Sequence, residues 1–214
     1  MPHSELGVAL QFDDVAQRRE AAALGMWTFL ATEILFFGVL FAAYIVARNL
    51  LPAGFAEGSR HTDIVLGAAE TGVLLTSSLV MSVAVRAVQL DRRTLGTVLL
   101  AGTALLAVAF LAIHGMEYVD EYHEGLVPRL RFAVTGPLAP QVEMFFFMYY
   151  VTTGFHALHV LIGAGAISVA AAGTWKGRYS ARRYDVVELI GLYWHLVDIV
   201  WVFVFPCYYL VSRS

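Results

Sequence analysis

Five long apolar stretches, separated by short polar segments, dominate the pattern of hydrophobic and polar positions along this chain. Their approximate limits are 24–47, 64–85, 95–116, 141–172 and 187–211. A helix needs about 20 residues to cross a bilayer, so each stretch is long enough to span one. The fourth is longer than required and should tilt or extend beyond the hydrocarbon. The pattern predicts an all-α polytopic membrane protein, with a single domain of five transmembrane helices over residues 24–214.

The composition supports this prediction and excludes several other classes of protein. Of 214 residues, 59% are hydrophobic and 14% are charged, and the mean hydropathy is +0.68. A soluble domain of this size cannot bury so much apolar surface. Cys207 is the single cysteine, which excludes an intrachain disulfide and a thiolate metal cluster. Residues 1–23 are polar and mixed in charge, so we expect a cytoplasmic segment there and no cleavable signal peptide.

The Lys and Arg residues of the connecting segments predict the orientation in the membrane. The richer side holds Arg18, Arg19, Arg86, Arg92, Arg93, Lys176, Arg178, Arg182 and Arg183, and the other side holds Arg48, Arg60, Arg129, Arg131 and Arg213. Lys and Arg accumulate in cytoplasmic loops. We therefore expect the N-terminus in the cytoplasm and the C-terminus outside. The acidic connection 117–136, which is the longest, then lies outside as well.

Several ionisable residues fall near the middle of the predicted helices. At about 1.5 Å of rise per residue, Glu33 lies roughly 14 Å from the inner end of its helix, and His195 and Asp198 lie roughly 12 and 17 Å from the inner end of theirs. His159 and His156 lie roughly 20 and 24 Å deep in the fourth helix. Because ionisable groups are costly in lipid, these positions predict surfaces that pack against protein. We expect His195 and Asp198 each to meet a partner on another helix, with His156, His159 and Glu33 as candidates at the same depth.

Helical spacing places the polar residues on distinct faces. Glu188, Gly191, His195 and Asp198 form one stripe, and Thr152, His156, His159 and Gly163 form another. Glu70, His114 and Glu117 are predicted nearer the outer face. Small residues such as Gly163 and Gly165 permit close approach between helices.

Three interpretations of the buried polar residues remain open on this basis. They could be hydrogen-bonding groups that fix helix packing. They could form a proton site or relay, since intramembrane Glu, His and Asp often do. They could bind a metal or haem, because His156 and His159 are three residues apart and His195 could complete a site.

Glu33 has apolar neighbours on both sides in the sequence, including Phe29, Leu30, Phe36 and Phe37. An unpaired carboxylate is strongly disfavoured in such surroundings. We therefore expect a neutral carboxyl group at neutral pH, bonded to one partner helix.

The connection between the last two helices carries Lys176, Arg178, Arg182 and Arg183 beside two tyrosines. Cations close to a membrane surface attract anionic lipids. These four residues are candidates for binding lipid headgroups on the cytoplasmic side, and the alternative is that they only signal topology.

The motifs of the chain resemble those of subunit III of the haem-copper cytochrome oxidases, in its short bacterial five-helix form. The most specific are TGFHALHVLIG at 153–163 and YWHLVDIVW at 193–201, and WTFLATE at 27–33, LLTSS at 74–78 and the pair Glu117-Tyr118 occur in the same order. Together the matching segments span almost the whole chain from about residue 24.

The resemblance implies a subunit without haem, copper or catalytic residues of its own. It implies a multi-pass protein of the bacterial inner membrane that packs against oxidase subunit I and other oxidase subunits, in a possible respiratory supercomplex. Its implied role is to support proton uptake and protect the oxygen-reducing site during turnover, within a complex that oxidises cytochrome c and translocates protons. Bound phospholipid is implied, no metal site and no nucleic acid are expected, and Glu33 matches the carbodiimide-reactive glutamate of the family.

Two departures from the family and three rival functions accompany this resemblance. The two additional N-terminal helices of longer members have no counterpart here, so lipid positions do not carry over. His114 stands where the family commonly has Gln, and an imidazole can titrate. The rivals are an accessory protein of nitric oxide reductase, the third subunit of a quinol oxidase, and a stand-alone haem-binding redox protein.

Overall fold

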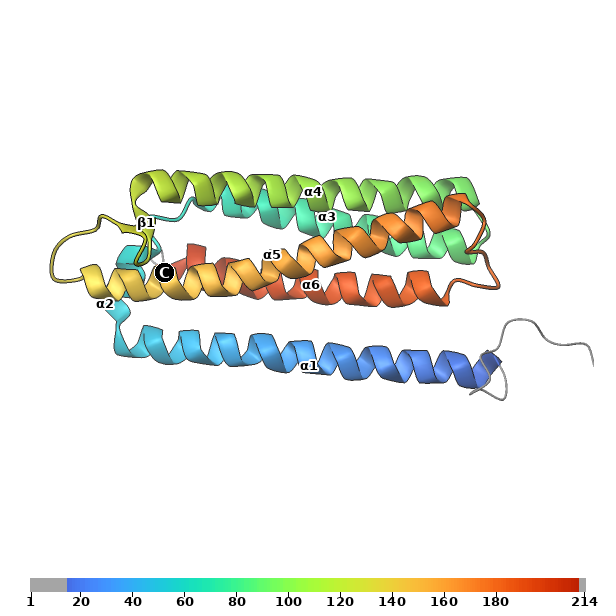
Figure 1. The fold of residues 1–214 in the computed structure, drawn as a ribbon, viewed down its shortest axis with the longest axis horizontal. Helices are drawn as coiled ribbons and strands as arrows, with labels where there is room; N and C mark the ends of the chain where they lie inside the picture. The colour runs from blue at the N-terminus through green and yellow to red at the C-terminus, as the bar shows by residue number, and fades with distance from the viewer. Residues whose placement is uncertain (1–14, 212–214) are drawn as a thin grey trace, which may run out of the picture.

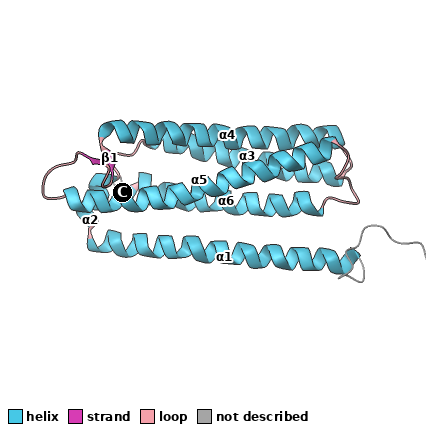
Figure 2. Ribbon diagram, in the orientation of Figure 1, coloured by secondary structure: helices cyan, strands magenta, loops and turns pink. Residues whose placement is uncertain are grey.

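The computed structural model describes residues 15–211, which are almost entirely helical (Figures 1 and 2). The elements are α1 Val15–Leu50, α2 Pro52–Gly58, α3 Ile64–Gln89, α4 Arg93–Glu124, β1 Leu126–Val127, β2 Arg131–Phe132, α5 Ala139–Trp175 and α6 Asp185–Tyr209. Within the described residues, α1, α3, α4, α5 and α6 are long and apolar enough to cross a membrane. The prediction of an all-α protein with five membrane-spanning helices is therefore confirmed. Arg213, one of the cations counted for orientation, lies outside the described residues.

The observed helices extend beyond most of the limits expected from hydropathy. The largest differences are in α1, which already begins at Val15, and in α4, which continues to Glu124. The first part of the expected loop 117–136 is therefore helical. Hydropathy marks where apolar residues stop, whereas a helix continues through polar residues until a breaker. Here the breaker is Gly125, whose φ of 74° is left-handed and whose N–H caps the helix. The short helix α2 and the two-residue strands were not predicted, because segments this short have no readable periodicity.

Four of the long helices form a bundle, and α1 lies along one side of it (Figure 1). Within the bundle, the most extensive contact is between α3 and α4, followed by the contact between α4 and α5. Helix α6 packs against both α3 and α5. Helix α1 contacts α6, α5 and α2 more sparsely. In the most apolar window of α1, 17% of residues are buried, against 44% in α6. Most of the apolar surface of α1 therefore faces away from the chain.

Aromatic side chains fill the interior of the bundle. The fully buried ones include Trp194, Trp201, Tyr149, Tyr208, Tyr209, Phe110, Phe145 and Phe146. Many of their rings meet edge to face, a favourable arrangement for aromatic pairs. Phe110 and Trp201, for example, meet with centroids 4.9 Å apart and planes at 85°.

One end of the bundle, here named the hairpin end, carries α2 and the β1–β2 hairpin. The two strands pair antiparallel, with Leu126 opposite Phe132. Phe55 of α2 is fully buried and packs edge to face against Tyr44 and Phe145, at centroid distances of 5.4 and 5.5 Å. The short helix therefore fills the space between the end of α1 and the beginning of α5.

Close contact between α5 and α6 depends on Gly163, as the spacing of small residues predicts. A Cβ atom at this position would lie 2.8 Å from the ring of Trp194, which is fully buried and cannot retreat. Gly165, two residues further along α5, has nothing within 4 Å of the same added atom.

We predict that Gly163→Val destabilises the protein, because overpacking a well-filled interior costs typically about 1–3 kcal/mol. The matched control is Gly165→Val, which adds the same side chain to the same helix where there is space for it. Thermal unfolding in mild detergent should show a lower midpoint for the first variant alone. Equal midpoints for the two variants would contradict the packing described here.

Candidate functional site

Glu33 of α1 and His159 of α5 meet midway along the two helices. The Nε2 atom of His159 lies 3.0 Å from Oε2 of Glu33. The side chains are 17% and 15% exposed, so the pair is largely shielded by the protein. The sequence placed both residues in the same layer of the membrane, and the structure brings them into direct contact.

The other ring nitrogen of His159 determines how protons are distributed in this pair. Nδ1 lies 2.7 Å from the carbonyl oxygen of Phe155, which can only accept a hydrogen bond, so Nδ1 carries a hydrogen. Nε2 then either accepts a hydrogen bond from a protonated Glu33 or, in a charged imidazolium, donates one to its carboxylate. In both states, one proton is shared between Nε2 and the carboxyl group.

Aromatic rings surround the imidazole of His159. Phe37 and Phe36 lie 5.2 and 6.3 Å from it between centroids, and Phe36 packs edge to face on Phe155. The hydroxyl of Tyr193 donates a hydrogen bond to the backbone carbonyl of His159, at 3.0 Å. Three helices thus fix the position of the ring and restrict the access of water to it.

His195 has different partners from those proposed on the basis of depth. Its Nδ1 atom lies 2.8 Å from the hydroxyl oxygen of Ser78, and its Nε2 atom lies 3.3 Å from that of Ser82. Both serines belong to α3, so the expected partner on another helix is present, but the candidates Glu33, His156 and His159 were wrong for this residue. Depth along the membrane normal does not specify which neighbouring helix a stripe faces.

Asp198 is buried, and its hydrogen-bonding neighbour is Ser78 of α3. The expected partner on another helix is therefore present, but it is none of the candidates Glu33, His156 and His159. Glu188, placed on the same stripe, is exposed, whereas Gly191 is buried, and a Cβ atom added there would lie 3.1 Å from the side chain of Val85 on α3. The stripe turns toward α3 only beyond its first residue.

His156 has neighbours on different helices from those of His159. It is fully buried, with its ring 5.1 Å from that of Trp201 and 5.6 Å from that of Phe110. Neither ring nitrogen has a hydrogen-bond partner within the described part of the chain. The shared metal site considered for His156, His159 and His195 does not form here, because their partners lie on different helix faces.

The three residues predicted nearer the outer face converge into one buried cluster. Nδ1 of His114 lies 3.2 Å from Oε1 of Glu70 and 3.6 Å from Oε2 of Glu117. Tyr209 donates a hydrogen bond of 2.7 Å to Oε2 of Glu117. Tyr209 can approach α3 closely because Gly67 has no Cβ atom, which would lie 2.8 Å from the tyrosine ring. We refer to Glu70, His114 and Glu117 as the outer cluster.

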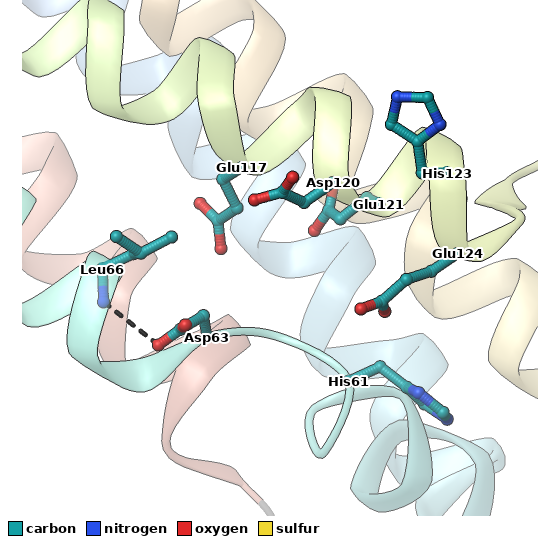
Figure 3. Close-up of a pocket in the computed structure, with 8 residues that line it drawn as sticks. All are labelled: His61, Asp63, Leu66, Glu117, Asp120, Glu121, His123 and Glu124. Atoms are coloured by element: carbon teal, nitrogen blue, oxygen red, sulfur yellow. Dashed lines mark hydrogen bonds between the residues drawn. The ribbon is translucent and has the colours of Figure 1, made fainter.

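A cavity of about 260 Å³ opens beside the outer cluster at the hairpin end (Figure 3). Its acidic lining residues are Asp63, Glu117, Asp120, Glu121 and Glu124. Glu121 is 3% exposed, and its polar neighbours are the hydroxyl groups of Tyr150 and Tyr149. Glu121 was not predicted, because its spacing of one turn from Glu117 indicates a shared helix face only where α4 continues into the expected loop.

The four cations between α5 and α6, Lys176, Arg178, Arg182 and Arg183, are all exposed. None of them forms an ion pair within residues 15–211. The backbone around them is held by neighbouring helices: Arg19 donates to the carbonyl of Arg182 at 3.0 Å, and Arg93 donates to that of Thr174 at 3.0 Å. The loop therefore presents free cationic side chains from a fixed backbone.

Comparison with known proteins places this arrangement in a family. A family model described as cytochrome c oxidase subunit III matches residues 10–213. Cytochrome c oxidase subunit 3 of Thermostichus vulcanus is 28% identical over 211 residues, which cover 97% of this chain and 96% of its own length. A probable quinol oxidase subunit 3 of Staphylococcus haemolyticus is 27% identical, with 88% of each chain covered.

A third relative is a fused protein, the haem-copper oxidase subunit I+III of Aeropyrum pernix. It is 32% identical over 192 residues, which cover 87% of this chain and 22% of the fused protein. The family match extends over all five membrane-spanning helices, from before the start of α1 to beyond the end of α6. The chain belongs to the cytochrome c oxidase subunit III family.

Proposed function

We propose that this chain is the non-redox third subunit of a bacterial haem-copper terminal oxidase, embedded in the inner membrane with its N-terminus in the cytoplasm. The observation that carries the proposal is the family match over residues 10–213. The existence of a relative in which subunits I and III form one polypeptide supports subunit I as the main partner. The excess of Lys and Arg at the end opposite the hairpin supports the orientation.

In this role the chain stabilises subunit I and supports its proton uptake, and the catalytic haem and copper belong to the partner subunits. The outward apolar surface of α1 supports contacts with partner subunits and phospholipid acyl chains, because most of it is not covered within the chain. The shared proton of the Glu33–His159 pair serves to hold α1 on the bundle rather than to carry protons through it.

The electron donor distinguishes two versions of the proposal. Cytochrome c is the donor that the family description favours, and quinol is the alternative that the Staphylococcus haemolyticus relative supports. The test is to purify the chain with its partners in mild detergent and to measure oxygen uptake with reduced cytochrome c and with a quinol. We expect a haem-containing subunit I to co-purify and cytochrome c to be oxidised. A purified chain that itself holds stoichiometric iron or copper would overturn the non-redox assignment.

We predict that Glu33→Gln keeps the subunit bound and retains most oxygen reduction and proton pumping. The amide N–H of Gln can donate to Nε2 of His159, as a protonated carboxyl group does, so the contact between α1 and α5 is preserved. Glu33→Ala should be more damaging, because it leaves a void and an unpaired imidazole nitrogen. The measurement is the proton-to-electron ratio of the reconstituted enzyme, together with the amount of subunit that it retains.

The two variants separate a structural role from a role in proton transfer. If Glu33→Gln abolished pumping while the subunit remained bound, Glu33 would lie on a proton path and the structural role would be wrong. Glu33→Ala serves as the comparison, because it removes the hydrogen bond as well as the titratable group.

We predict that the cations between α5 and α6 bind anionic lipid headgroups. Arg178→Gln combined with Arg182→Gln should reduce the anionic phospholipid that co-purifies with the complex, since each cation near an anionic surface contributes about 1 kcal/mol. The matched control combines Arg60→Gln with Arg129→Gln, which removes two exposed arginines at the hairpin end. Lipid mass spectrometry provides the measurement. Unchanged anionic lipid in the first variant would leave these cations with a topological role alone.

A further inference from the structure

The outer cluster has the dimensions of a first coordination shell. One nitrogen of His114 and one oxygen each of Glu70 and Glu117 all lie within 4.8 Å of one another. Four ligands at about 2.0–2.2 Å from a tetrahedral zinc ion are separated from each other by roughly 3.3–3.6 Å. The distances from His114 Nδ1 to the two carboxyl oxygens, 3.2 and 3.6 Å, lie close to this range.

No Lys or Arg side chain balances the carboxyl groups of this cluster within the described residues. Glu70, His114 and Glu117 are no more than 2% exposed, and no Lys or Arg forms an ion pair with them among residues 15–211. Two ionised carboxyl groups beside one imidazolium would leave a buried negative charge, which is costly in a medium of low polarity. A divalent cation with a neutral imidazole balances both carboxylates.

The cluster also retains unused ligand atoms. Oε2 of Glu70, Nε2 of His114 and Oε1 of Glu117 have no hydrogen-bond partner within the described residues. Each of these side chains is more than nine-tenths buried. In Figure 3, the carboxyl groups of Glu117 and Glu121 both extend from α4 toward the cavity. The acidic cavity reaches Glu117 of the cluster and would concentrate cations at its mouth.

The surrounding side chains hold the ligands in place. The His114 ring stacks on Phe110 at 5.7 Å and lies 4.5 Å from the ring of Tyr118. Tyr209 fixes Glu117 through its hydroxyl group. Outer contacts of this kind are what orient the ligands of known metal sites.

We propose that Glu70, His114 and Glu117 bind a divalent cation of the zinc class, which enters through the acidic cavity at the hairpin end. Magnesium and calcium prefer shells made of oxygen ligands, whereas an imidazole among the ligands favours zinc. This departs from the expectation of no metal site in the chain. It is compatible with a subunit without redox chemistry, because zinc has a single stable oxidation state.

The test uses the purified membrane complex that contains this chain, dialysed against zinc chloride and then against buffer. Zinc content and affinity are measured by elemental mass spectrometry and calorimetry in the wild type, in His114→Gln and in His123→Gln. The first substitution removes a ligand but keeps a polar side chain of similar size. His123→Gln is the matched control, because His123 lies on the same helix beside the same cavity and its ring points away from Glu117 (Figure 3).

We expect stoichiometric zinc in the wild type and in His123→Gln. In His114→Gln the zinc affinity should fall by at least roughly 10–100-fold, the loss that changes outside the first shell already cause. Zinc X-ray absorption of the wild-type complex should show an imidazole nitrogen and carboxylate oxygens, and millimolar magnesium should not displace the ion. Equal zinc binding by the wild type and His114→Gln would overturn the proposal, as would equal loss in both histidine variants. A wild-type complex that binds no zinc would show that the cluster is only a proton-sharing network.

Discussion

The attachment of α1 to the other helices is the constraint on which the rest of this structure depends. Between helices in lipid there is no hydrophobic driving force, because acyl chains are as apolar as leucine. Helix α1 also packs sparsely, so polar contacts must hold it in place. Arg19 pairs with Asp185 near the start of α1, Glu33 meets His159 at the middle, and Tyr44 donates to the Cys207 carbonyl near the end. These contacts fix the angle of α1 on the bundle along its length.

The remaining polar groups are arranged by the same cost of burial. The hydroxyl groups of Ser77 and Ser78 on α3 are used by two residues of α6: Trp194 donates to Ser77, and His195 bonds with Ser78. These contacts fix the register of α3 against α6, while the aromatic residues fill the volume between them. The outer cluster differs, because its carboxyl groups are buried in excess of their partners. Excess buried carboxyl groups indicate a bound ion or proton. The proposed metal site therefore lies at this cluster and not among the residues near the middle of the membrane.

Sequence reasoning predicted the features that follow from hydropathy and depth. The five membrane-spanning helices, the layer shared by Glu33 and His159, and the need for a small residue at Gly163 are of this kind. It could not predict which helices are neighbours, so the partners assigned to His195 were wrong. The convergence of Glu70 with His114 and Glu117 could not be predicted either, because the hydropathy of a helix does not specify its rotation about its own axis. Glu121 was missed because its position one turn beyond Glu117 suggests a surface loop until the helix is seen to continue.

The most direct test of this account is a double-mutant cycle between Glu33 and His159. Each residue is replaced by Ala singly and together, and the stability of the assembled subunit is measured for all four proteins by thermal unfolding. If the pair holds α1 on the bundle, the two losses should be non-additive, with a coupling of about 0.6–2 kcal/mol, as measured for polar contacts between membrane helices. Additive losses would contradict the account, because they would show that the two side chains contribute to stability independently.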